Sequence, residues 1–288
     1  VELAQKSFAV FVRKDGGAGT IHYPLFPKDP FDEFSSFLLR SSSDDWNKTM
    51  FRDAMAQRIL DEHFTLDTQR YRPAVLFING EYFGIYNIRD KYNELHLAEK
   101  HDINPGDVDL LNVDTNTADG KKTITALHGS SEDYEDLLDF VRGHDMCLPD
   151  NYAFVRDQID VDNLIDYAIA EIYIGNASWF RNRKVWREDA AFEKWRFLLY
   201  DLDRSFDDPS TNELENLING DVLFKALLEN AEFRNEFLRR FANHLNTAFE
   251  TPRITALIDD LRAGIAFEVS RHIARWKGEC NGSVCGIQ

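Results

Sequence analysis

Cysteine is scarce in this chain of 288 residues, which contains only Cys147, Cys280 and Cys285. Three cysteines at these spacings form neither the framework of a small disulfide-stabilised protein nor a zinc-binding pattern. Cys280 and Cys285 bracket a short segment near the end of the sequence. Whether they close a small disulfide depends on the redox state of the compartment, so the paired and the reduced state both stay open.

Long apolar runs are also missing. No run approaches the roughly 20 residues that a membrane helix needs, so we expect no membrane-spanning segment. No signal peptide is recognisable, and because Val1 is not an initiator methionine, the earlier removal of a leader stays open. The hydrophobic content of 43% is enough for a sizeable core in one large domain or two closely packed lobes.

Basic residues are outnumbered, with 33 Lys and Arg against 50 Asp and Glu, which gives a formal net charge of −17. Without a basic stripe to face a phosphate backbone, nucleic acid is not an expected partner. A nucleotide would bind only where a metal ion and a few arginines offset the local negative field. The simplest explanation of the overall acidity is solubility.

The first third of the chain is predicted to contain strands and helices. Residues 7–12 and 35–40 have the composition of strands, and a helix is predicted from about Lys48 to His63, with Asn47 as its N-cap. Asn79-Gly80 is the favoured two-residue turn of a hairpin whose strands are residues 74–78 and 81–88. A further helix is predicted at residues 91–100.

The remainder is predicted to be mainly helical after a loop-rich stretch at residues 102–129. A second hairpin is predicted from residues 184–187 and 195–200. The predicted helices cover residues 131–142, 160–175, 220–230, 232–248 and 253–277. This order indicates an α+β chain with a mixed N-terminal lobe at 1–95 and a mainly helical C-terminal lobe at 96–288.

A polar loop and a pair of aspartates carry the clearest chemical signal. A helix ends at Gly175, residues 176–183 form a polar loop, and Asp201-Leu202-Asp203 follows an apolar strand. Carboxylates at a strand end are held rigidly and offer the oxygen ligands that Mg²⁺ prefers. In an extended segment Leu202 would point away from both aspartates, which would then share one face. Protein kinases use this order of loop, hairpin and metal-binding Asp, whereas the alternative is an ordinary acidic loop.

Several blocks of the sequence resemble the CotH kinase family, known from spore-coat protein kinases and many bacterial surface proteins. The two most specific blocks are residues 79–90, which begin with Asn79-Gly80-Glu81, and residues 195–203, which end with Tyr200-Asp201-Leu202-Asp203. The other blocks are Tyr23-Pro24-Leu25-Phe26, Phe37-Leu38-Leu39-Arg40, Arg52-Asp53-Ala54 and Gly175-Asn176. The resemblance spans about residues 7 to 205. It implies a two-lobed atypical protein kinase-like fold, ATP with Mg²⁺ or Mn²⁺, and phosphate transfer to Ser or Thr of a protein substrate. It also favours an extracellular, cell-surface or spore-coat location.

The resemblance assigns roles to residues of the loop and of the aspartate pair. Asp201 matches the metal-binding Asp of the family, and Asn182 matches a second metal ligand. Ser178 stands where the family usually has its catalytic Asp, and Arg183 stands where it often has a second Asn. Serine is a poor general base at neutral pH, and loss of a positioned base typically removes about 10²–10⁴ in rate. Asp203 is the candidate that would replace this base.

Four charged residues of the first third are candidates for nucleotide binding. A guanidinium matches phosphate geometry, which makes Arg40, Arg52 and Arg89 candidates for phosphate contacts. Asp90 stands where the family usually has Glu, and it would pair with a basic group or contact a metal ion. The alternative for each of these residues is a salt bridge that serves only the structure.

Three functions are compatible with these residues. The first is a metal-dependent protein kinase. The second is a pseudokinase or a surface interaction module, as Ser178 and Arg183 indicate. The third is a carboxylate-based hydrolase using Asp201 and Asp203, which is disfavoured because acids so close on one strand do not give the spacing of an inverting hydrolase.

Overall fold

The structure is a computed structural model that describes residues 4–13, 19–26, 31–61, 63–115 and 122–278. The question of a Cys280–Cys285 disulfide lies outside these residues. The chain forms two compact units, of which one comprises residues 1–58, 69–92 and 251–288 and the other residues 59–68 and 93–250. Helices alternate with antiparallel sheets in the described chain, which confirms the α+β class. The lobe boundary near residue 95 stays a prediction.

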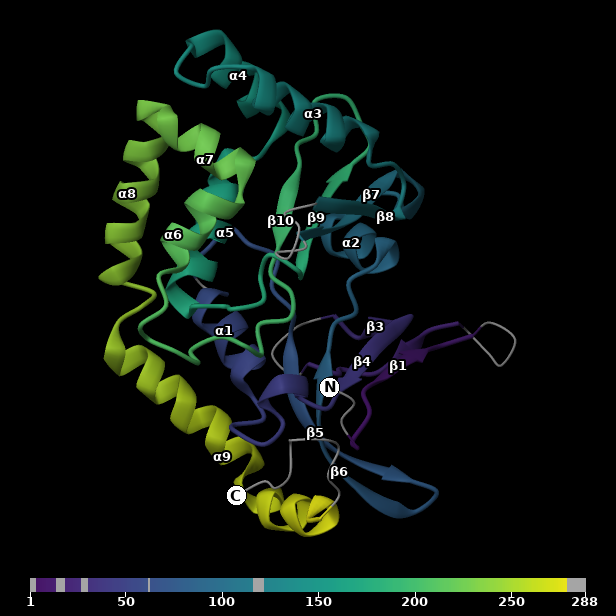
Figure 1. The fold of residues 1–288 in the computed structure, drawn as a ribbon. Coiled ribbons are helices and arrows are strands. Elements are labelled where there is room, and N and C mark those ends of the chain that lie inside the picture. The colour runs from purple at the N-terminus through teal and green to yellow at the C-terminus, as the bar shows by residue number, and fades with distance from the viewer. Residues whose placement is uncertain (1–3, 14–18, 27–30, 62, 116–121, 279–288) are drawn as a thin grey trace. The chain divides into compact units, whose positions relative to one another are not determined.

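The first unit is built on an antiparallel sheet with the strand order β1-β4-β6-β5 (Figure 1). Its strands are β1 (Phe8–Phe11), β4 (Ser36–Arg40), β5 (Tyr71–Ile78) and β6 (Glu81–Arg89), and β2 (Ile21–His22) pairs with β3 (Glu33–Phe34) beside them. The long helix α9 (Thr251–Trp276) packs against β6. Gly84 permits this packing, because a side chain there would lie 2.7 Å from Nδ1 of His272.

The hairpin predicted around Asn79-Gly80 is confirmed. Asn79 and Gly80 have φ angles of 51° and 80°, which are the left-handed conformations that this turn requires. The predicted N-cap at Asn47 is wrong, because helix α1 (Arg52–Leu60) begins later, after a short 3-10 turn η2 (Ser43–Asp45). The Asp45 carboxylate accepts a hydrogen bond from the Arg52 backbone N–H at 2.9 Å, so an upstream acid satisfies the start of this helix.

The second unit contains another antiparallel sheet, with the strand order β10-β9-β7-β8. Its strands are β7 (Val108–Thr115), β8 (Lys122–His128), β9 (Arg183–Glu188) and β10 (Arg196–Leu198). Its helices are α2 (Glu94–His101), α3 (Glu132–Gly143), α4 (Pro149–Gln158), α5 (Val161–Ile174), α6 (Glu213–Gly220), α7 (Val222–Glu229) and α8 (Ala231–Leu245), with the 3-10 turn η3 (Pro105–Asp107). Helix α5 packs against β10, α6 and α8, so it is central to this unit.

The loop predicted at residues 102–129 is wrong, because most of this stretch forms β7 and β8. Strand β7 is central in its sheet and pairs with both β8 and β9. Acidic residues such as Asp109 obscured it in the sequence. In the structure Asp109 is 3% exposed and accepts a hydrogen bond at 3.0 Å from Arg187 on β9. Its charge is therefore balanced by a residue that is distant in sequence.

Among the described residues, no helix has both the length and the apolar surface that crossing a bilayer requires. This agrees with the absence of long apolar runs in the sequence.

Candidate functional site

The loop of interest begins where helix α5 ends. Gly175 adopts the left-handed conformation, with φ 60° and ψ 48°, and its N–H returns to the last carbonyls of the helix. The Asn176 N–H also points back and donates to the Glu171 carbonyl at 3.3 Å. Glycine adopts this conformation without steric cost, which is why helices commonly end this way. The sharp reversal brings the Asn176 side chain back to the last turn of α5.

Backbone hydrogen bonds join this loop to the segment that carries the aspartates. The Ala177 N–H donates to the Arg204 carbonyl at 3.4 Å, and the Phe206 N–H donates to the Ile174 carbonyl at 2.6 Å. Residues that are about 30 apart in sequence are therefore held side by side. The second segment follows β10, which pairs with β9 directly after the loop.

The two predicted metal ligands are in direct contact. Nδ2 of Asn182 donates a hydrogen bond to Oδ2 of Asp201 at 2.7 Å, and it lies 3.5 Å from Oγ of Ser178. These contacts use the amide nitrogen of Asn182 and leave its amide oxygen as the atom suited to a cation. Which amide atom is oxygen follows from this hydrogen-bond network. The structure thus brings together Ser178, Asn182 and Asp201.

Ser178 is held as a hydrogen-bond donor. Its hydroxyl donates to Oδ1 of Asn176 at 3.0 Å, and its backbone N–H reaches the same oxygen at 3.2 Å. Ser178 is 8% exposed. A hydroxyl that donates a hydrogen bond to a buried amide is poorly suited to act as a general base, which would have to take a proton from a substrate hydroxyl.

The extended conformation expected for residues 201–203 is wrong. Asp201 has a φ angle of 61°, and the residues after Leu202 form a turn. This left-handed conformation is uncommon outside glycine, although Asp tolerates it better than most residues. Asp203 lies in the turn and is 4% exposed, whereas Asp201 is half-buried.

Sequence reasoning missed two buried groups beside the loop. Oε2 of Glu171 accepts a hydrogen bond from Nδ2 of Asn176 at 2.9 Å, and burial raises the pKa of Glu171 to about 8. Arg183 pairs with Asp221, and both side chains are less than 5% exposed. The available signal for Glu171 was one acidic residue within the otherwise apolar end of α5. Nothing local to Arg183 indicated Asp221.

The tryptophan of the loop is a packing residue. Trp179 is 1% exposed, and its ring lies 4.7 Å from the Phe180 ring and 6.2 Å from the Tyr167 ring. The guanidinium of Arg183 lies 5.9 Å from the same ring. These contacts anchor the middle of the loop on α5 and β9.

The predicted nucleotide-binding residues Arg52, Arg89 and Asp90 form ion pairs within the first unit. Nη2 of Arg89 lies 3.0 Å from Oδ2 of Asp53, and Nε of Arg52 lies 3.4 Å from Oδ1 of Asp45. Asp90 accepts hydrogen bonds from the Arg70 guanidinium, at 2.7 Å from Nη2 and at 3.0 and 3.1 Å from Nε.

Arg40 ends strand β4 in register with Asn87 of β6 and is half-buried. Arg89 is 1% exposed, and its three side-chain nitrogens make no well-formed hydrogen bond to the described residues. Its contact with Asp53 is therefore an ion pair without hydrogen-bond geometry, and the guanidinium retains donors that would suit a phosphate.

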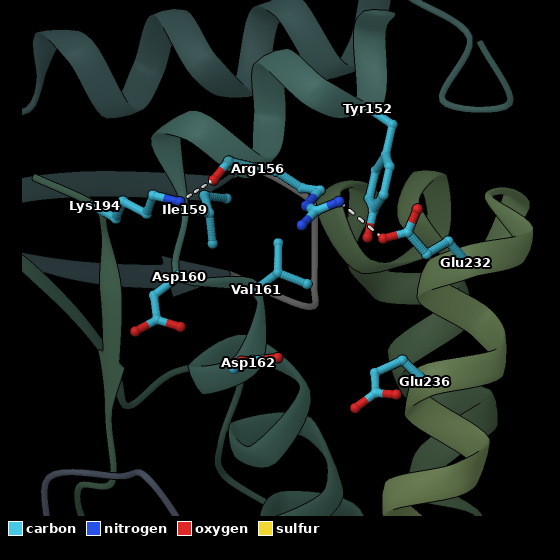
Figure 2. A pocket seen from close by; sticks show the side chains of 9 residues that line it. All are labelled: Tyr152, Arg156, Ile159, Asp160, Val161, Asp162, Lys194, Glu232 and Glu236. Carbon is cyan, nitrogen blue, oxygen red and sulfur yellow. Dashed lines mark hydrogen bonds and ion pairs between the residues drawn. The ribbon is translucent and has the colours of Figure 1, made fainter. Parts of the chain in front are cut away.

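A surface pocket of about 330 Å³ lies at the opposite end of α5 (Figure 2). The helix has 14 residues and is about 21 Å long, so this pocket is separate from the loop after Gly175. Its carboxylates are paired with arginines: Glu232 with Arg156, Asp162 and Glu236 with Arg240, and Asp160 with Arg196. Since their charges are balanced, we assign no ligand to this pocket.

The donor set around Asn182 suits a hard divalent cation. Asn182 offers an amide oxygen and Asp201, in contact with it, offers a carboxylate. Mg²⁺ and Mn²⁺ prefer such oxygen ligands and complete their coordination with water and phosphate.

The family model described as "CotH kinase protein" matches residues 1–283 of the 288 residues. No curated protein matches the chain. The resemblance seen in the sequence is thereby confirmed over almost the whole chain.

Proposed function

Since this chain belongs to the CotH kinase family, we propose that it is a metal-dependent protein kinase that transfers phosphate from ATP to Ser or Thr of a protein substrate. The contact of 2.7 Å between Asn182 and Asp201 is the observation that carries this proposal. It joins the two predicted metal ligands, which are 19 residues apart in sequence. We also propose that the two compact units correspond to the lobes of an atypical protein kinase-like fold.

In this function Asn182 and Asp201 would hold Mg²⁺ or Mn²⁺. A divalent metal neutralises charge on the phosphates of the nucleotide, and phosphoryl transfer depends mainly on such electrostatics and on positioning. The acceptor hydroxyl forms a bond to the γ-phosphorus, the bond from phosphorus to ADP breaks, and the hydroxyl proton passes to a base. We propose Asp203 as this base, because the Ser178 hydroxyl already donates a hydrogen bond to Asn176.

Arg40, Arg52, Arg89 and Asp90 stay predictions as nucleotide-binding residues. The pairing of Arg52, Arg89 and Asp90 sets a condition on this role. A phosphate that contacts Arg89 must displace the Asp53 carboxylate or share the guanidinium with it. The same holds for a phosphate at Arg52 and the Asp45 carboxylate. Asp90 would have to exchange Arg70 for another partner before it contacts a metal ion.

A pseudokinase or interaction module is the second candidate, and the state of Ser178 favours it. A serine that donates to a buried amide supplies no base, so a metal and a nucleotide would bind without efficient transfer. A cell-surface or spore-coat location suits both candidates and stays a prediction.

A transfer assay separates these candidates. The protein is incubated with labelled ATP, Mg²⁺ or Mn²⁺ and a Ser- and Thr-rich acceptor, beside Asp201→Ala. The matched control is Asp208→Ala, which removes an exposed acid a few residues later. We expect transfer by the wild type and by Asp208→Ala and its loss in Asp201→Ala. Absence of transfer by the wild type, with retained nucleotide binding, would instead establish the pseudokinase.

A further inference from the structure

A chain of hydrogen bonds runs from the buried end of α5 to Asp201. Glu171 accepts from Asn176 at 2.9 Å, Asn176 accepts from the Ser178 hydroxyl at 3.0 Å, and Asn182 joins Ser178 to Asp201. Glu171 is 1% exposed and Asn176 is fully buried. The hydrogen bonds at the Glu171 end are therefore shielded from water. In such surroundings a hydrogen bond is stronger, and a polar group without a partner costs more free energy.

Each link of these hydrogen bonds has a defined direction, which the Ser178 backbone sets. A backbone N–H can only donate, and that of Ser178 contacts Oδ1 of Asn176 at 3.2 Å, so the Asn176 amide oxygen faces Ser178 and its NH₂ faces the Glu171 carboxyl. That oxygen accepts a hydrogen bond from the Ser178 hydroxyl, which leaves the lone pairs of Oγ to accept from Nδ2 of Asn182. With Nδ2 of Asn182 shared between Ser178 and Asp201, its amide oxygen is left for a cation.

Glu171 is not itself suited to act as a base for the acceptor hydroxyl. A proton moving from the loop to Glu171 would have to cross the Asn176 amide, which has no readily exchangeable acid–base form near neutral pH. The contribution of Glu171 must then be geometric. Besides Asn176, the groups that act on the pKa of Glu171 are Tyr167 of its own helix, Arg183 of β9 and Glu213 of α6.

We propose that Glu171 is a positioning residue, which acts through Asn176 to hold Ser178 as an acceptor for Asn182 and so to orient the Asn182 amide. This proposal rests on the proposed function, because the orientation of the Asn182 amide matters for binding a metal ion. In this arrangement Ser178 has a structural role. It occupies the position of the family's base, but it accepts a hydrogen bond from the metal ligand Asn182 and does not accept a proton.

The test compares two replacements of Glu171. Glu171→Gln retains an oxygen that accepts from Asn176, whereas Glu171→Met keeps a similar length without any acceptor. We expect backbone amides of residues 177–182 to exchange with deuterium about tenfold faster in Glu171→Met, since a buried donor loses its partner. Glu171→Gln should exchange like the wild type. Ile172→Met, a half-buried neighbour on the same helix, is the matched control and should change nothing.

The pattern of exchange decides between positioning and a general structural role. Faster exchange confined to the loop, with α5 and β9 unchanged, supports the proposal. Equal loop exchange in Glu171→Met and Glu171→Gln overturns it, and so does an increase that extends equally through α5. Asn176→Ala tests the same link from the other side and should also loosen the loop alone.

Binding of Mn²⁺ alone separates this proposal from the proposed function. We expect Glu171→Met to bind Mn²⁺ about tenfold more weakly, in line with the loop exchange, and Asp201→Ala to lose binding. If Asp201→Ala binds Mn²⁺ as tightly as the wild type, the proposed metal site is wrong. The positioning role of Glu171 then stands or falls on the exchange result.

Discussion

Arg183 forms a buried ion pair with Asp221, the residue that caps helix α7. Asp221 also accepts a hydrogen bond from the Phe224 N–H at 2.8 Å. The pair thus connects the first residue of β9, just after the candidate loop, to a helix about 40 residues later.

Arg183→Asn is expected to destabilise the protein by about 3–5 kcal/mol, because it leaves the Asp221 carboxylate buried and unpaired. The free energy of unfolding is measured by denaturant titration. Adding Asp221→Asn should recover much of the loss, since no charge is then buried. Equal stability of Arg183→Asn and the wild type would contradict a coupled pair.

Glu171 is expected to make stability depend on pH. Burial raises the pKa of Glu171 from 4.5 to about 8, so between these values the unfolded chain releases a proton that the folded chain retains. The contribution of this group to stability is full below pH 4.5 and is lost as the pH rises through 8. Glu171→Gln cannot titrate, so its Tm should exceed that of the wild type increasingly toward pH 8, by at least about 2–4 °C. Parallel Tm profiles of the two proteins would show that Glu171 titrates normally.

Ser178→Asp places the family's usual base in the loop. If the wild type transfers phosphate slowly, we expect this variant to be faster by about 10²–10⁴, the typical contribution of a positioned base. The single-turnover rate with labelled ATP measures the effect. Ser178→Asn has the same size without a base and is the control. A rate that rises equally in both variants would point to packing as the cause.

Because of His272, the stability of the first unit is expected to fall at acidic pH. Its Nδ1 accepts a hydrogen bond from the Ile85 N–H at 2.9 Å, and burial lowers the pKa of His272 from 6.5 to about 4. As the pH falls below 6.5 the unfolded chain takes up this proton first, so stability is full above 6.5 and is lost toward pH 4. His272→Gln should show a flatter Tm profile over this range. A wild-type profile with the same slope would argue against the role of this histidine.

Local patterns in the sequence were sufficient for much of the fold. The Asn79-Gly80 turn, the helix that ends at Gly175 and the hairpin before Asp201 follow from turn preferences and apolar periodicity, which act between near neighbours. Strands β7 and β8 were not foreseen, because the charge of Asp109 is balanced only by Arg187, far along the chain. Helices α4 and α6 were also not foreseen.

For the candidate site, the sequence alone predicted Asn182 and Asp201 as metal ligands. It also showed that Ser178 occupies the position of the family's catalytic base. Only the tertiary structure decided that Asn182 contacts Asp201, that Asp201 adopts a left-handed conformation, and that Ser178 donates to a buried amide. It also decided the partners of Glu171, Arg183 and Arg89. The physical reason is that a buried polar group is defined by the partner that satisfies it, and folding brings that partner from another part of the chain.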